Sequence, residues 1–141
     1  MIGAAQAGRI VAATVLLAAP LASSADESVP DQRPPSVIIE RPTERAIVVP
    51  MPQANVSAPI EPVLIEGAAG DDVEMFAVTL HIIDTIGRTS VVMATCDGCG
   101  SKVARWNFRA TLPPGSYTVQ ARGHDTAGNT GFSQNRQFYV L

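Results

Sequence analysis

The sequence is poor in the residue types on which most catalytic and metal sites depend. It has two cysteines, Cys96 and Cys99, and two histidines, His81 and His124. A zinc site normally takes three or four protein ligands, so the simpler interpretation of the two histidines is that they lie on the surface. No serine or cysteine stands in a recognisable arrangement with a base and an orienting acid, so we expect no enzyme and no catalytic residue.

Aromatic residues and positive charge are scarce as well. There are one Trp, two Tyr and four Phe, and the formal net charge is −3 without any basic run. A chain of this charge is not expected to bind nucleic acid. Most of the aromatic residues are needed in a core. Only Tyr139 and Phe132 are therefore candidates for an exposed platform of the kind that binds sugar rings.

Long hydrophobic runs are absent after residue 25, but residues 10–22 are apolar. Arg9 is the only charge before Asp26, and the small residues Ser23 to Ala25 follow the apolar run. This pattern predicts a signal peptide, residues 1–25, cleaved after Ala25. An uncleaved anchor and a buried helix are the alternatives, but a bilayer span takes roughly 20 residues. We expect the mature chain to be secreted or periplasmic, with no membrane span after cleavage.

The mature chain would have about 116 residues, which fits one domain. Residues 26–35 are polar and rich in proline, and we expect a flexible lead-in, because they can bury too little apolar surface to offset the entropy of ordering. Residues 36–141 are then the predicted domain. The chain has eleven prolines, together with glycine-containing turns and few helix signals, and these features favour β structure.

Seven segments of this domain read as strands. In the clearest one, Trp106, Phe108, Ala110 and Leu112 fall on one face and polar residues on the other, as in a strand with one buried face. The segments are short and are separated by turn residues: 36–40 with 46–50 (a split first strand), 63–67, 73–84, 89–95, 104–112, 117–125 and 133–141. They predict an antiparallel β-sandwich.

The stretch "LPPGSYTVQARGHDTAGN" (112–129), with "QFYV" (137–140), resembles the last strands of bacterial immunoglobulin-like and fibronectin type III-like domains. The resemblance covers residues 36–141 and implies a seven-stranded immunoglobulin-like sandwich. Three structural roles accompany it. Tyr117 stands where a tyrosine corner would place its ring in the core, Gly115 permits a positive φ in the turn, and Trp106 is expected in the core.

The two cysteines form a Cys-x-x-Cys motif, which can be a redox pair, half a metal site or a disulfide. A redox pair usually begins a helix, and the residues after Cys99 show no helical pattern. A metal site would need a second pair of ligands. In an oxidising compartment we therefore predict a disulfide between Cys96 and Cys99, which shapes a loop around the Asp97-Gly98 turn.

Carboxylates cluster in two loops. Asp71 and Asp72 follow the second predicted strand, and Asp125 lies in the "DTAGN" turn. Calcium takes six to eight oxygen ligands, so these three residues are candidate calcium ligands, although their spacing matches no defined calcium loop. Solvated turn carboxylates are the alternative interpretation. No other cofactor is expected.

The sequence thus suggests a secreted, non-enzymatic module for protein interaction, adhesion or structural support at or outside the cell envelope. Its partner would be a protein or a cell-surface glycan. The candidate binding residues are two outward rows: Arg105, Asn107 and Arg109, and Gln120, Arg122 and His124. Each row can equally be a solvated face. The alternative functions are a carbohydrate-binding accessory module and a calcium-stabilised adhesin-type domain.

Overall fold

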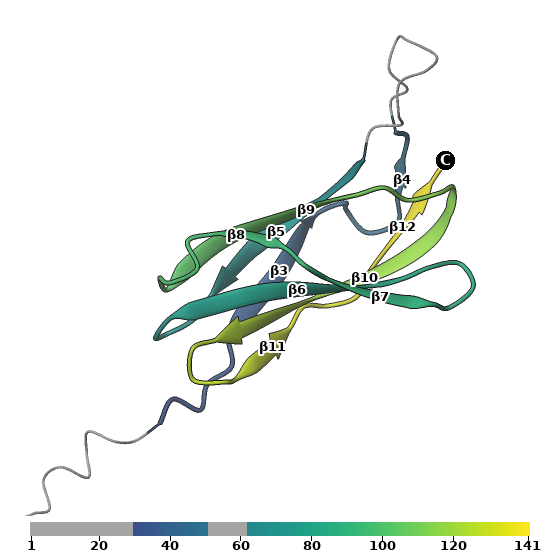
Figure 1. Ribbon diagram of the computed structural model, residues 1–141. Helices are drawn as coiled ribbons and strands as arrows, with labels where there is room; N and C mark the ends of the chain where they lie inside the picture. The colour runs from purple at the N-terminus through teal and green to yellow at the C-terminus, as the bar shows by residue number, and fades with distance from the viewer. Residues whose placement is uncertain (1–29, 51–61) are drawn as a thin grey trace, which may run out of the picture. The chain divides into compact units, whose positions relative to one another are not determined.

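A computed structural model describes residues 30–50 and 62–141 of the chain (Figure 1). These two ranges contain ten strands and no helix. The chain divides into two compact units, residues 1–31 and 32–141, and all ten strands belong to the second. The predicted signal peptide lies outside the described residues. Among those that are described, no helix is long and apolar enough to cross a membrane.

The strands form two sheets (Figure 1). The four-stranded sheet has the order β3 (Ser36–Arg41), β5 (Val63–Gly70), β9 (Val103–Ala110) and β8 (Thr95–Asp97). The six-stranded sheet has the order β4 (Ala46–Val48), β12 (Arg136–Val140), β10 (Gly115–Asp125), β6 (Met75–Ile83) and β7 (Thr89–Met93), and β11 (Thr130–Phe132) also pairs with β10. This distribution of strands is that of an immunoglobulin-like sandwich. The predicted all-β fold is confirmed, and nothing in it singles out the fibronectin type III variant.

The structure has three short strands beyond the seven predicted. β4, β8 and β11 have only three residues each, which is too short for an alternating pattern to stand out in the sequence. The predicted split first strand consists of β3 and β4, which lie in different sheets. β4 pairs in parallel with β12, whereas the other strand pairs are antiparallel.

The core lies between the two sheets and follows the period of two in the sequence. Every second residue of β10 from Tyr117 to Asp125 is buried, and β5 alternates in the same way. Trp106 is 1% exposed, and its Nε1 donates a hydrogen bond to the Ala68 carbonyl on the neighbouring strand (3.2 Å). The indole packs over Gly67, where an added Cβ would lie 2.6 Å from its ring. The tryptophan is thus accommodated because its neighbour has no side chain.

Tyr117 joins the start of β10 to the turn before it. Its ring is buried and stacks on Phe138, with centroids 5.7 Å apart. Its hydroxyl donates a hydrogen bond of 2.6 Å to the Pro113 carbonyl four residues upstream. This is the geometry of a tyrosine corner. Gly115, between them, has φ +152°, and a Cβ there would lie 2.4 Å from Thr85 Oγ1.

The predicted disulfide is confirmed. Cys96 in β8 and Cys99 are bonded, with their Cα atoms 5.6 Å apart. Gly98 between them has φ +101°, which glycine adopts readily. After the disulfide, the Gly100 amide donates to the Met75 carbonyl at the start of β6 (2.8 Å). The loop therefore links β8 of one sheet to β6 of the other.

Candidate functional site

Asp71 and Asp72 form the loop between β5 and β6. The Asp71 amide donates to the Lys102 carbonyl (2.8 Å), in the segment that follows the disulfide. Asp71 Oδ2 accepts hydrogen bonds from the amides of Val73 (3.0 Å) and Glu74 (2.9 Å). Two backbone donors and its own amide thus hold the Asp71 carboxylate in one orientation.

The other oxygen of Asp71 is less well satisfied. Oδ1 is buried, and no residue in the described ranges donates a hydrogen bond to it. A buried carboxylate oxygen normally has a donor, an ordered water or a cation beside it. Asp72 is exposed, and its Oδ2 lies 3.5 Å from Arg33 Nη1. Asp71 therefore offers a fixed oxygen and Asp72 an exposed one.

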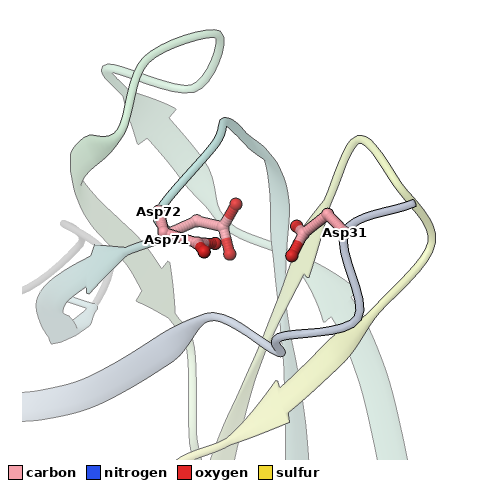
Figure 2. Close-up of side chains that lie close together, drawn as sticks. All are labelled: Asp31, Asp71 and Asp72. Carbon is pink, nitrogen blue, oxygen red and sulfur yellow. The ribbon is translucent and has the colours of Figure 1, made fainter. Parts of the chain in front are cut away.

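Asp71 and Asp72 belong to an acidic group that could hold a metal ion, and each offers a carboxylate oxygen within 4.8 Å of the other (Figure 2). Asp31, the third residue labelled in Figure 2, belongs to the first compact unit. The ligand set within the second unit is therefore Asp71 and Asp72.

Asp125, the third calcium ligand expected from the sequence, is not part of this group. It is 3% exposed, and its carboxylate accepts hydrogen bonds from the Ala127 amide (3.0 Å), the Asn129 amide (2.7 Å) and Asn129 Nδ2 (2.8 Å). The turn folds back on the carboxylate, as Asp does in many tight turns. Asp125 thus stabilises the turn between β10 and β11.

His81 and His124 lie on neighbouring strands, β6 and β10, of the six-stranded sheet. His81 pairs with Gln120, four residues from His124, which places the two roughly 13 Å apart along the strands. His124 contacts two threonine hydroxyls, at 3.0 and 3.1 Å, through its two ring nitrogens. Partial burial, helped by Arg122 and His124, lowers the pKa of His81. Neither histidine belongs to a group of three or more possible metal ligands in the described part of the chain.

The two outward rows lie on different sheets, because β9 belongs to the four-stranded sheet and β10 to the six-stranded one. In the β9 row, Arg105 pairs with Glu40, whereas the Arg109 guanidinium makes no hydrogen bond or ion pair with any described residue. In the β10 row, Arg122 bonds to Gln120 (3.1 Å) and lies 5.0 Å from the Phe132 ring centroid. The six residues therefore do not form a single surface.

Comparison with known proteins yields fold similarity alone. No protein-family model and no curated protein matches the chain. Among solved structures, CopC from Methylosinus trichosporium OB3b matches with a TM-score of 0.48 and 17% identity, over 74% of this chain and 93% of that one. PcoC, a methionine-rich copper resistance protein from Escherichia coli, matches with a TM-score of 0.43 and 16% identity, over 77% and 100%. A structure of T cell activation by the superantigen toxic shock syndrome toxin-1 contains a chain that matches with a TM-score of 0.46 and 9% identity, over 75% and 100%.

The function expected from the sequence is wrong. That expectation was an interaction or adhesion module, with a carbohydrate-binding module or an adhesin-type domain as alternatives. The matched structures include PcoC, which is a copper resistance protein. The error has a simple cause: a sandwich fold hosts many functions, so the resemblance of the last strands to immunoglobulin-like domains carried no information about the ligand.

Proposed function

We propose that this chain is an exported, non-catalytic β-sandwich protein that binds a divalent metal ion in the β5–β6 loop. The buried Oδ1 of Asp71 carries the proposal, because among the described residues it has no hydrogen-bond donor. An ionised oxygen in that position is costly unless a cation or water compensates its charge. Asp72 supplies a second carboxylate within reach of the same ion.

The donor chemistry favours a hard cation. Carboxylate oxygens suit calcium, magnesium and manganese, and water or backbone carbonyls commonly fill the remaining positions. Copper(II) binds most oxygen and nitrogen sites more tightly than other divalent first-row ions. Copper is included in the test for that reason.

Two further features support the exported and non-catalytic parts of the proposal. The expected signal peptide and the Cys96–Cys99 disulfide both fit an oxidising compartment such as the periplasm or the medium. The contacts of His124 are two threonine hydroxyls, without the orienting carboxylate that nucleophilic catalysis uses.

The test is calorimetric titration of the chelator-treated mature chain with calcium, manganese and copper(II). Asp71→Asn retains an oxygen for the two backbone amides but loses the charge, so the fold should survive while metal affinity falls at least tenfold. Asp72→Asn should weaken binding less, because that side chain is exposed. Asp97→Asn, an exposed carboxylate in β8, is the matched control and should leave affinity unchanged.

A thermal melt provides the second readout. A bound ion at 100 times its Kd stabilises the folded state by about 2.7 kcal/mol, so the melting temperature should rise in the wild type and not in Asp71→Asn. The proposal is refuted if no ion produces heat or a thermal shift, or if Asp71→Asn binds as tightly as the wild type.

A further inference from the structure

The six-stranded sheet ends at β7, and one side of that strand is open. β7 is last in the strand order, and β6 is its one strand neighbour in the part of the chain that the structure describes. A strand at the edge of a sheet presents unpaired N–H and C=O groups, to which another strand can bind. The hydrogen bonds between β6 and β7 show which residues of β7 present these groups.

Two hydrogen bonds fix the side to which each β7 residue turns its backbone. At one end of the hairpin the Asp84 amide donates to the Arg88 carbonyl (2.9 Å), and at the other end the Ala94 amide donates to the Val78 carbonyl (2.9 Å). In an antiparallel pair, residues that bond to the neighbouring strand alternate with residues that do not. The even-numbered residues from 88 to 94 therefore bond to β6.

Thr89, Val91 and Met93 thus direct their N–H and C=O groups away from β6. No other described segment donates a hydrogen bond to these groups or accepts one from them. The three side chains are exposed, Val91 by 59% and Met93 by 64%, whereas Val92 between them packs against the core. β7 therefore combines three unpaired backbone positions with exposed apolar side chains.

The other strand edges in the described ranges have features that natural proteins use to prevent pairing. β3 carries Glu40 and Arg41, and its register with β5 is irregular at that point. β4, β8 and β11 have only three residues each. β7 has five residues, and none of them is charged or a proline. It is therefore the described edge best suited to pair with another strand.

We propose that β7 pairs antiparallel with β7 of a second copy of this chain, about a two-fold axis at Val91. Val91 stands midway between Thr89 and Met93, so one register satisfies both copies, as a two-fold contact requires. Val91 then lies opposite Val91 of the partner subunit, and Thr89 lies opposite Met93 of the partner subunit. Each of these pairs exchanges two backbone hydrogen bonds.

Charge favours a second copy as the occupant of this edge. Like charges directly opposite each other destabilise a strand pair, and a chain with a net charge of −3 meets this problem wherever two copies touch through acidic residues. β7 brings no charge opposite another, because it has none. The nearest charge, on Arg88 beside Thr89, is offset within its own chain by the ion pair with Asp84.

The contact is small, so the dimer should be weak. Five residues of each strand offer less surface than the standard interface of about 1,600 Å². We expect a dissociation constant of about 0.1 mM. The inference is independent of the metal proposal, because Asp71 and Asp72 lie in the β5–β6 loop and not in the β6–β7 hairpin.

Sedimentation velocity of the mature protein, in the presence of a chelator, tests the association. The protein should be mostly monomeric at about 10 µM and mostly dimeric at about 1 mM. Val91→Lys places two positive charges opposite each other at the axis and should raise the dissociation constant about tenfold or more. The matched control is Ile47→Lys, at a residue that is 68% exposed in β4 on the opposite edge of the same sheet, and it should leave the constant unchanged.

Amide hydrogen exchange locates the contact. Between the low and the high concentration, the amides of Thr89, Val91 and Met93 should gain protection. Those of Ser90 and Val92, which already bond to β6, should change little. The proposal is refuted if the protein stays monomeric at about 1 mM, and a strand of a different protein is then the remaining occupant. It is also refuted if Val91→Lys dimerises like the wild type or if the gain in protection lies outside β7, since the copies then associate through another surface.

Discussion

Tyr117→Phe isolates a single hydrogen bond of the fold. The substitution keeps the buried ring and its stacking on Phe138. It removes only the hydroxyl, which donates a hydrogen bond of 2.6 Å to the Pro113 carbonyl. Pro113 is exposed, so water can replace the lost donor and the full desolvation cost does not apply. The expected loss is about 1 kcal/mol in the free energy of unfolding. For a unit of this size that is about 4 °C in melting temperature.

The assay is urea denaturation of the mature protein, followed by far-UV circular dichroism. Tyr139→Phe is the matched control, because Tyr139 is 46% exposed and no described residue hydrogen-bonds to its hydroxyl. Its midpoint should equal that of the wild type, while the midpoint of Tyr117→Phe falls with an unchanged slope. Equal midpoints for the wild type and Tyr117→Phe would refute the reasoning, as would equal losses in the two variants.

The Tyr117 hydroxyl also predicts how the stability of the fold changes with pH in alkaline solution. Burial, and secondarily the charge of Asp84, raises the pKa of Tyr117 above its ordinary value of about 10. Below pH 10 the phenol is protonated in both the folded and the unfolded chain, and its contribution is constant. Above pH 10 the unfolded chain ionises first, so stability falls as the pH rises towards the folded-state pKa. In Tyr117→Phe this part of the alkaline loss should disappear, which denaturation midpoints between pH 8 and 11 would show.

Three further predictions concern stability and are read as denaturation midpoints. Replacing both Cys96 and Cys99 by serine should cost about 2 kcal/mol, because the disulfide closes a very small ring, and a reductant should not destabilise that variant further. Gly67→Ala should cost about 1–3 kcal/mol, since the new Cβ would lie 1.9 Å from a β3 carbonyl, whereas Gly70→Ala, with 3.5 Å to its nearest neighbour, should be close to neutral. Asp125→Ala should cost about 3 kcal/mol, because the turn amides lose a buried charged acceptor. If the double cysteine variant, Gly67→Ala or Asp125→Ala is as stable as the wild type, the contact described for that residue does not contribute as argued.

The candidate site was only partly accessible from the sequence. Asp71 and Asp72 could be named in advance, because adjacent loop carboxylates are visible in any sequence. In the sequence, Asp125 looks like a third loop carboxylate of the same kind. In the folded "DTAGN" turn it is buried and accepts a hydrogen bond from the Asn129 amide, which the sequence does not show.

Local patterns determined most of the fold. Three features each reflect the conformation of a few consecutive residues: the alternation around Trp106, the Pro-Gly turn before Tyr117 and the Asp97-Gly98 turn. The sequence alone therefore predicted a β-sandwich and a loop closed by a disulfide. Tertiary structure decided the rest. It placed β3 and β4 in different sheets, put the β9 and β10 rows on different sheets and left Asp71 Oδ1 without a donor among the described residues. These features arise from contacts between segments far apart in the chain, and no local period in a sequence encodes them.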